Sequence, residues 1–546
     1  MRAKKTSTVK RAGTEQKGPV LDVLKSLLQS GRSEAVVSLV EKLVARNSEL
    51  EQRLAQLLSR GHKNEGVSTA QLKLFAEMLT AEATSAPEEI TDANKKLRET
   101  SGIDRDVKES AAAKKRQPVL RRPIPSGLRR VDNDLAVPAE ERKCPVCGAD
   151  RKCIGHDVSE VIELIPAEVV VRVDRREKLA CKTCEGELVR APVGDKVVSA
   201  GRLGTRLVAT LLVDKYDDGL PLHRTKQRLE RMGLPLPIST LADQVTWASD
   251  LLRPLWRLAV MEVLAAKVMH LDGTGLPVLD RDAPGGKRTG ALWGYVGDEN
   301  IAAYLYASTG KKRGQKPGEL GPEDMLENRV GYTVADASSL FDQSFKRDDL
   351  IECGCHMHAR RRFAYALDAG DARAALPLGA YKKLYEIEAK VRDLGDDERL
   401  RIRQAESKPV WDELCAWCDT YQRHEPPSSK LGEAIRYNKN HRIALGRFLE
   451  DGAIPIDNGI VERLHVRAAL TRKNYLFAGS DAGGERAAIV YTMLACCRLA
   501  EANPVEYLAD VLPRLARRVR LSDIGDLMPA RRGAQNAAEE PAASQN

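Results

Sequence analysis

The feature that most constrains the fold is a series of strand-like segments, two of which lead directly into an aspartate. Val268–Leu271 is an apolar run that ends at Asp272, and Gly331–Ala335 ends in the same way at Asp336. Short apolar and β-branched runs between turn residues are typical of strands. Three more strands and two helices are expected nearby, at Ala291–Val296, Ala302–Ala307, Leu350–Cys353, Glu323–Asn328 and His358–Leu367. The region is therefore predicted to have an α/β fold.

The order of these elements predicts three antiparallel strands followed by helix, strand, helix and strand, as in a ribonuclease H-like fold. That fold places one acid on its first strand, a second at the end of its fourth, and a third on a later helix. Asp272, Asp336 and Glu462 match these places. Three carboxylates can hold two Mg²⁺ ions about 4 Å apart for an in-line displacement at phosphorus. Any one of the 78 acids could be an ordinary surface residue, but these positions favour a metal site.

The segment that contains Glu462 combines this acid with bases and amides. It begins with Asp457-Asn458-Gly459 and continues through Arg472-Lys473-Asn474 to Gly483-Gly484-Glu485-Arg486. Basic side chains neutralise the phosphates of nucleic acids, so the mixture is typical of phosphoryl transfer on DNA. The candidate DNA ligands are His358, Arg463, Arg467, Arg472, Lys473 and Arg486. The alternative is an exposed basic helix without a partner.

Two Cys-x-x-Cys pairs lie upstream, formed by Cys144, Cys147, Cys181 and Cys184. Four thiolates suit tetrahedral Zn²⁺, and each pair presents two of them to one ion. The pairs predict a structural zinc site within residues 143–190, with strands expected in Val158–Val173. The alternatives are four free cysteines, or Cys153 as a substitute ligand.

A second group of metal-type side chains follows the last predicted strand, at Cys353, Cys355, His356 and His358. These side chains are too crowded along the chain for an obvious tetrahedral set of ligands. A structural or phosphate-binding role is favoured for them, and metal binding is the alternative.

The remaining segments differ in composition. Heptad-spaced apolar residues from Val36 to Leu57, with Asn47 in the seam, predict a leucine-zipper-like helix that joins two copies of the chain. An amphipathic helix packed on its own domain is the alternative. Helices at Leu203–Lys215, Leu222–Met232 and Ser239–Ser249 predict a helix-turn-helix-like region, with plain core helices as the alternative.

These patterns divide the chain into successive segments. The expected divisions are a disordered tail (1–20), a helical zipper-like segment (21–100), a basic proline-containing linker (101–142), the zinc-binding segment (143–190), the helix-turn-helix-like region (200–255), a catalytic domain (262–500) with a helical insertion (368–450), a C-terminal segment (501–530) and a second tail (531–546). The linker is either solvated or in contact with phosphates.

Composition limits the classes of protein to which the chain can belong. Its 546 residues suffice for about three or four domains. The net charge of +9 is mild, so the average charge alone does not identify a polyanionic partner. No apolar run reaches the roughly 18 residues that span a bilayer. Eleven cysteines without a secretory signal predict a reducing, cytoplasmic environment and no membrane partner.

The sequence resembles the insertion sequence 66 family of bacterial DDE transposases over residues 30–530. The motifs that carry the resemblance are those around Glu462, together with Phe477-Ala478-Gly479-Ser480, Lys215-Tyr216, Leu220-Pro221-Leu222, Ser239-Thr240-Leu241-Ala242 and Leu292-Trp293-Gly294-Tyr295. The resemblance implies that Asp272, Asp336 and Glu462 form the catalytic triad, with Mg²⁺ as cofactor. It also implies that the protein acts in the bacterial cytoplasm, at the nucleoid. The implied partners are terminal inverted repeats, target DNA and accessory proteins of the same element.

The chain departs from the family pattern beside the carboxylates. Gly273-Thr274 replaces an acid and a threonine after the first aspartate, Ala337-Ser338 replaces Gly-Tyr after the second, and Gly459 replaces the second asparagine of an Asn-Asn pair. The triad is present, so the predicted function is strand cleavage and strand transfer at the ends of a mobile element. The alternatives are an inactive sequence-specific DNA-binding protein derived from a transposase, and an unrelated metal-dependent nuclease.

Overall fold

The computed structural model describes residues 87–101, 168–179, 189–190, 201–298, 300–309, 313–315, 319–336, 338, 340–517 and 519–532. The predicted zipper, the four zinc-type cysteines, and most of the linker and terminal tails lie outside the described residues. Within the described part, no helix combines the length and apolar composition that a membrane crossing requires.

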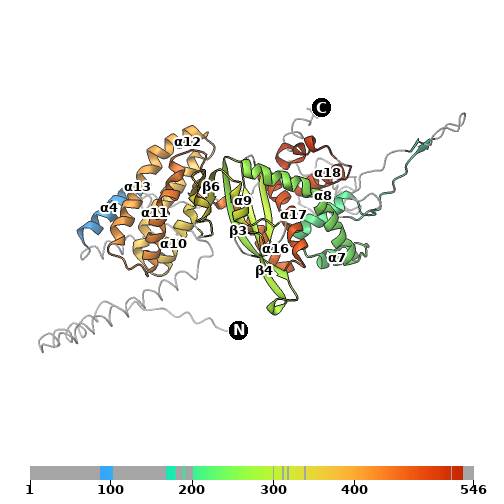
Figure 1. Ribbon diagram of the computed structural model, residues 1–546, viewed down its shortest axis with the longest axis horizontal. Helices are drawn as coiled ribbons and strands as arrows, with labels where there is room; N and C mark the ends of the chain where they lie inside the picture. Colours follow the sequence, from blue (N-terminus) through green and yellow to red (C-terminus); the bar gives the residue numbers. More distant parts are fainter. Residues whose placement is uncertain are drawn as a thin grey trace, which may run out of the picture.

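A five-stranded mixed sheet forms the centre of the molecule (Figure 1). Its strands are β3 (Val268–Leu279), β4 (Lys287–Val296), β5 (Ala302–Ala307), β6 (Gly331–Ala335) and β7 (Leu350–Gly354). The order across the sheet is β5-β4-β3-β6-β7. The first three strands are antiparallel, whereas β6 and β7 run parallel to β3. The predicted strands are confirmed, and β3 and β4 extend further than expected.

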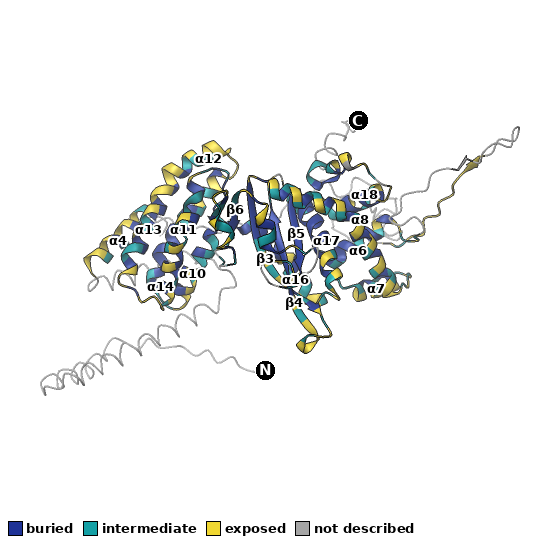
Figure 2. Cartoon of the chain, viewed as in Figure 1, coloured by how far each residue is buried: buried dark blue, intermediate teal, exposed yellow. Residues whose placement is uncertain are grey.

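The long β3–β4 hairpin projects from the sheet, and its tip is exposed (Figure 2). Helix α9 (Pro322–Glu327) precedes β6, close to its predicted position. Between β6 and β7, where the predicted order has a helix, the described residues form only the 3₁₀ turn Ser344–Lys346. Phe341 nevertheless packs into the first core from this connection.

The sheet separates two hydrophobic cores because successive side chains of a strand point to opposite faces. Met269 and Leu271 belong to the first core, and Val268 belongs to the second. The helices that close the first core are α6 (Thr205–Tyr216), α8 (Ile238–Ala265), α16 (Gly459–Tyr475), α17 (Asp481–Leu499) and α18 (Pro504–Ala516). The strands are consequently buried along most of their length (Figure 2).

Helix α8 connects the predicted DNA-binding region to the sheet. The predicted helices Leu203–Lys215 and Leu222–Met232 correspond to α6 and α7 (Leu222–Arg231), but α8 is far longer than the expected Ser239–Ser249. Its C-terminal half lies against β5, where the Trp256 indole donates a 2.8 Å hydrogen bond to the Tyr304 carbonyl. The second half of α8 is therefore a core helix of the sheet, so only α7 and the start of α8 are left for a separate helix pair.

The second core is closed by α10 and by the predicted helical insertion (Figure 1). The helices involved are α10 (His356–Asp368), α11 (Ala375–Val391), α13 (Lys408–Gln422), α14 (Lys430–Asn440) and α15 (Arg442–Gly446), whereas α12 (Asp396–Ile402) contributes no residue to this core. The aromatic side chains of the insertion, Trp411, Trp417, Tyr421 and Tyr437, are buried and pack its core.

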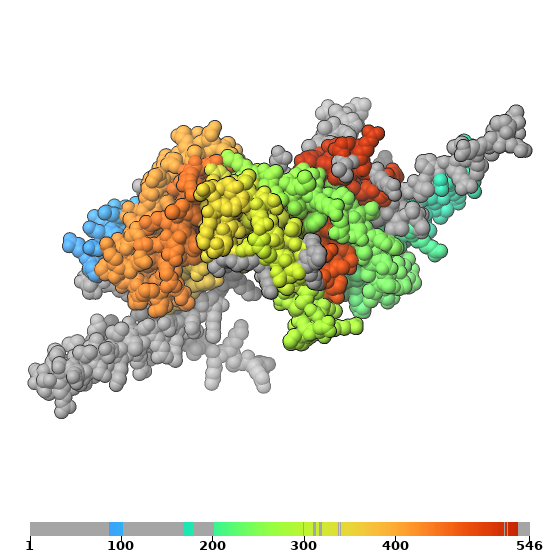
Figure 3. Space-filling view, viewed as in Figure 1, coloured from blue at the N-terminus to red at the C-terminus, as the bar shows by residue number. Residues whose placement is uncertain are grey.

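An N-terminal helix, α4 (Glu88–Ser101), packs on the insertion although more than 250 residues separate them (Figure 3). The carboxamide oxygen of Asn94 accepts hydrogen bonds from Trp417 and Tyr421, each at 2.9 Å. Residues 87–101 thus belong to the same folded unit as the insertion.

The predicted zinc-binding segment is described only in part. Strands were expected in Val158–Val173, but the described residues 168–173 contain none. Two short strands follow instead, and β1 (Lys178–Leu179) pairs with β2 (Val189–Arg190) in an antiparallel arrangement.

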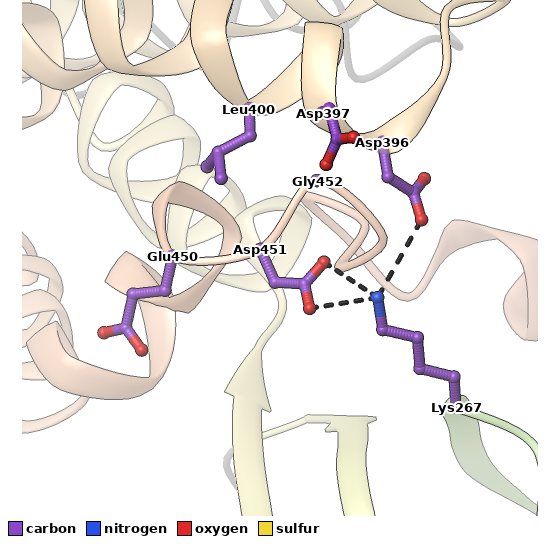
Figure 4. Close-up of a pocket in the computed structure, with 7 residues that line it drawn as sticks. All are labelled: Lys267, Asp396, Asp397, Leu400, Glu450, Asp451 and Gly452. Carbon is purple, nitrogen blue, oxygen red and sulfur yellow. Dashed lines mark hydrogen bonds and ion pairs between the residues drawn. The ribbon is translucent and has the colours of Figure 1, made fainter.

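Two basic side chains, Arg329 and Lys267, stabilise the start of β3 through hydrogen bonds and ion pairs. The Arg329 guanidinium is buried and donates to the carbonyls of Leu264, Ala266, Lys267 and Tyr332. Lys267 reaches the insertion, where its ammonium lies 3.0 Å from Asp451 and 3.9 Å from Asp396 (Figure 4). The hollow around Lys267 has a volume of about 480 Å³, and two of the acids that line it, Asp396 and Asp451, pair with this lysine.

Candidate active site

The two predicted aspartates meet at the sheet. Leu271 of β3 is in register with Ala335 of the parallel strand β6, so the residues that follow them, Asp272 and Asp336, lie at neighbouring positions. Adjacent strands are about 4.8 Å apart, which brings the two carboxyl groups within range of one shared site. The structure therefore brings together the two acids that the sequence predicts at strand ends.

The surroundings of Asp272 disfavour its negative charge. Burial, together with the negative charge of Asp336, raises the pKa of its carboxyl to about 6 against the opposing effect of a 2.8 Å hydrogen bond from the Gly273 amide. Two carboxylates in a partly buried site repel each other unless a cation offsets their charge. These residues fit a divalent cation, whose binding competes with protonation and so weakens as the pH falls through about 6.

The start of α16 is anchored by Asn458, which is fully buried. Its carboxamide nitrogen donates to the Leu271 carbonyl at 2.8 Å, and its oxygen accepts from His270 Nδ1 at 3.0 Å. Its backbone amide donates to Cys355 Sγ at 3.3 Å. One asparagine thus ties the helix that carries Glu462 to the strand that carries Asp272.

The residues on either side of Asn458 shape this anchor. Asp457 accepts a hydrogen bond from the Gly459 amide and another from the Tyr385 hydroxyl, both at 2.8 Å. A Cβ atom at position 459 would lie only 2.8 Å from Asp457 Oδ1 and 3.1 Å from Arg463 Nη1. The glycine that departs from the family pattern therefore occupies a crowded position.

Glu462 lies among basic and thiol side chains. Its carboxylate oxygens are 3.5 Å from His358 Nδ1 and 3.7 Å from Arg361 Nη2. Cys355, His358 and Glu462 form a group whose ligand atoms all lie within 4.8 Å of one another, whereas Glu462 forms no equally close group with the two aspartates among the described residues. The structure brings the aspartates together and places Glu462 beside α10.

His358 and Arg361 stand between these two sets of acids. The pKa of His358 is lowered by burial and by the charge of Arg361, while Asp336 and Asp272 oppose that shift. The positive charge of Arg361, and that of His358 when it is protonated, also favours the ionised form of Asp272. The carboxylates, His358 and Arg361 are therefore one electrostatically coupled site.

His465, one turn after Glu462 on α16, was missed by sequence reasoning. Its ring Nε2 lies 3.1 Å from the Asp272 carbonyl oxygen and 3.7 Å from Asp272 Oδ2. Burial lowers the pKa of His465 to about 4, so the ring is neutral and its Nε2–H donates to the carbonyl. His465 holds the backbone of the first aspartate, and its only sequence signal is its spacing of three residues from Glu462.

Two glycines make room for this packing. Gly294 of β4 is in register with Asp272, and a Cβ there would lie 2.8 Å from His465 Cε1. A Cβ at Gly273 would lie 2.4 Å from the Trp293 ring. The Leu292-Trp293-Gly294-Tyr295 motif thus supports Asp272 from the neighbouring strand, and Trp293 explains why this chain has glycine directly after that aspartate.

The predicted DNA ligands on α16 differ in the hydrogen bonds and ion pairs that their side chains form within the protein. Arg463 and Lys473 are exposed and form no hydrogen bond or ion pair with other described residues. Arg467 lies 3.9 Å from Asp217. Arg472 donates to the Thr274 hydroxyl at 2.9 Å and to the Gly275 carbonyl, so it fastens α16 to β3.

The fifth base, Arg486, lies on the first turns of α17 and is half-buried. Its positive charge adds to burial in lowering the pKa of Lys215 on α6. The candidate bases therefore extend from α16 to the start of α17.

The four residues Cys353, Cys355, His356 and His358 do not share one role. His356 is fully buried, its Nε2 hydrogen-bonds the Leu445 carbonyl at 2.7 Å, and its ring packs against Phe448 and Trp411. Cys353 is buried in the same core. These two residues pack the second core, whereas Cys355 and His358 face Glu462.

Two protein-family models match the chain. Residues 200–486, just over half of the chain, match the model of the transposase IS66 family. The chain belongs to the IS66 family of transposases. Residues 141–185 match a second model, the zinc-finger binding domain of transposase IS66, which includes all four predicted zinc-type cysteines.

Similar IS66-like chains occur in Sinorhizobium fredii (strain NBRC 101917 / NGR234). The uncharacterized protein y4hP is 32% identical over 484 residues, which cover 84% of this chain and 83% of that protein. The uncharacterized protein y4qI is 31% identical over 442 residues, which cover 79% of this chain and 80% of that protein. These relatives extend the family likeness beyond the matched domain.

Proposed function

We propose that this IS66-family protein is an active DDE transposase that cleaves and joins DNA strands at the ends of an insertion sequence. The observation that carries the proposal is the pair Asp272 and Asp336 at neighbouring strand ends, beside a helix that Asn458 anchors and that bears Glu462. The strand order β5-β4-β3-β6-β7 supports a ribonuclease H-like core. Metal-dependent cleavage of labelled element ends tests the proposal directly.

Each residue has a distinct role in this proposal. Asp272, Asp336 and Glu462 would hold two Mg²⁺ ions, which when bound supply positive charge to the attacking and leaving oxygens of the displacement. His465 holds the Asp272 backbone, and Asn458 sets the position of α16. His358 and Arg361, which contact Glu462 in this structure, would turn to the phosphate whose charge the reaction redistributes.

The remaining parts of the proposal concern partners. Terminal inverted repeats and target DNA would lie along Arg463, Arg467, Arg472, Lys473 and Arg486. The zipper-like segment would join two copies of the chain, and accessory proteins of the same element would complete the complex. The protein would act in the cytoplasm at the nucleoid, with one structural Zn²⁺ held by Cys144, Cys147, Cys181 and Cys184.

The zinc site gives a first prediction. We expect about one zinc ion per chain in the purified protein, and Cys181→Ser should release it because only three thiolates remain. Elemental analysis measures the metal, and limited proteolysis should show faster cutting within residues 143–190 of the variant. Cys418→Ser is the matched control, because Cys418 is buried in the insertion and should leave the zinc content unchanged. Purified protein without zinc would refute the assignment.

The bases of α16 give a second prediction. Arg463→Ala and Lys473→Ala should each weaken binding about equally on element ends and on random duplex, because phosphate contacts carry no sequence information. Each should also reduce the slope of log affinity against log salt by about one unit. Binding titrations at several salt concentrations measure both effects.

The choice of variants follows from the contacts of each base. Arg472→Ala should also lower thermal stability, since it loses its bonds to β3. Lys408→Ala is the control, because Lys408 pairs with Asp412 on the insertion and should leave the slope unchanged. If both Arg463→Ala and Lys473→Ala keep the slope of the unaltered protein, these bases do not contact DNA phosphates and belong to an exposed helix face without a partner.

A further inference from the structure

A thiol, an imidazole and a carboxylate that could ligate one metal ion lie beside the pair of aspartates. Cys355 Sγ, a ring nitrogen of His358 and a carboxylate oxygen of Glu462 are mutually within 4.8 Å. Cys355 immediately precedes α10, His358 lies on its first turn, and Glu462 comes from α16. Two elements that are distant in sequence thus direct three different ligand types to one point.

The spacing suits a small tetrahedral cation. With bonds of about 2.0 Å to nitrogen and oxygen and 2.3 Å to sulfur, the ligand atoms of a zinc site are roughly 3.3–3.8 Å apart. The separation of 3.5 Å between His358 Nδ1 and Glu462 Oε1 is already in this range. The remaining adjustment is about 1 Å or less, which a partly exposed glutamate side chain can supply.

The surroundings also favour a cation there. His358 Nδ1 is buried and makes no hydrogen bond within the described part of the chain. Burial raises the pKa of the Cys355 thiol to about 12, and the 3.3 Å hydrogen bond from the Asn458 amide to Cys355 Sγ opposes that rise, so a bound cation would displace the thiol proton. Asp272 and Asp336 add negative charge nearby, whereas Arg361 and Arg362 are opposing charges, and Arg361, at 3.7 Å from Glu462, must move aside.

We propose that Cys355, His358 and Glu462 form a second metal site that takes Zn²⁺ or a similar soft divalent cation, and that its occupation withholds Glu462 from the magnesium centre. Thiolate and imidazole ligands select Zn²⁺ over Mg²⁺. Zinc at this site would therefore stop strand cleavage while magnesium is abundant. The inhibitory effect rests on the proposed function, whereas the metal site itself does not.

Cobalt provides a test that needs no enzymatic activity. Co²⁺ titrated into the full-length, zinc-loaded protein should produce a thiolate-to-cobalt charge-transfer band that saturates at one added equivalent. Cys355→Ala should abolish this band. Cys353→Ala, which removes a buried thiol two residues away, should keep it. His358→Gln, a change at a partly exposed position, should weaken Co²⁺ binding at least about tenfold. This variant tests the site if Cys355→Ala does not fold.

Inhibition is measured in parallel as the ratio of cleavage rates with and without added Zn²⁺ for each protein. We expect strong inhibition of the unaltered protein and of Cys353→Ala, and little inhibition of Cys355→Ala. A cobalt band that persists in Cys355→Ala and His358→Gln, or no band in the unaltered protein, overturns the site. Equal inhibition of Cys355→Ala and the unaltered protein overturns the regulatory role. Complete absence of cleavage by the unaltered protein would contradict the transposase proposal. The cobalt band would still show whether the metal site exists.

Discussion

Asp272→Asn, Asp336→Asn and Glu462→Gln are each expected to abolish Mg²⁺-dependent strand cleavage while DNA binding remains. Each change keeps the size of the side chain but removes an anionic metal ligand. Residues that only support metal ligands typically cost 10–100-fold when altered, so we expect losses above about 100-fold for the ligands themselves. Cleavage rates at saturating DNA, measured over a range of Mg²⁺ concentrations, give the result.

The matched control for the aspartates is Asp342→Asn, which alters an exposed acid six residues after Asp336. It should retain nearly full activity. DNA affinity is measured for every variant, so that a failure to bind is not mistaken for a failure to cleave. Substantial cleavage by any one of the three carboxylate variants would reject that residue as a ligand.

Asn458→Ala is expected to have the second largest effect, because it removes the anchor between β3 and α16. The change leaves the buried Leu271 carbonyl and the His270 ring without their hydrogen-bond partner. Each unsatisfied buried group costs about 1–3 kcal/mol, so the free energy of unfolding should fall by roughly 2–5 kcal/mol. Cleavage should also fall in the molecules that remain folded, because Glu462 loses its fixed position relative to Asp272.

A comparable asparagine separates these two effects. Asn438 is buried in the insertion, where it accepts from Tyr381 and donates to the Ala434 carbonyl at 3.1 Å. Asn438→Ala should lower stability by a similar amount but leave the cleavage rate per folded molecule nearly unchanged. Urea denaturation gives the stability, and single-turnover cleavage gives the rate. Equal cleavage by Asn458→Ala and Asn438→Ala, after correction for the folded fraction, would show that the anchor has no part in catalysis.

The sheet was predictable from the sequence because its strands are apolar, short and bounded by turn residues. Gly331–Ala335 and Ala302–Ala307 form strands at their expected bounds. The length of β3 was not predictable, since beyond Leu271 it pairs with β4 and, at a single bridge, with Ala478, and it contains two glycines and a proline. Such residues are depleted in strands, and here the long antiparallel pairing overrides that local preference.

The helices were predictable in position but less so in extent. Helix α8 continues past the expected Ser249 through Pro254, because its second half packs against β5 and α17. A single sequence does not reveal which face of a helix will find a partner, so tertiary packing decides its length.

Part of the candidate site was predictable from the sequence, and part was not. Asp272 and Asp336 could be found because each ends an apolar strand, and parallel strands bring such ends together. His465, Asn458 and Arg361 could not be assigned, since their roles depend on contacts between segments more than 100 residues apart. The nearness of Glu462 to Cys355 and His358 likewise arises because the starts of α10 and α16 meet, where the Asn458 amide donates to Cys355 Sγ, and no local pattern encodes this contact.

The most direct test of the central claim uses the unaltered protein with a labelled duplex that carries one end of its insertion sequence. We expect Mg²⁺-dependent cutting at the element boundary that leaves a 3′-hydroxyl, joining of that end to target DNA, and neither product with a chelator or on random duplex. The same protein bound to the element end but unable to cut it with Mg²⁺ or Mn²⁺ would contradict the account.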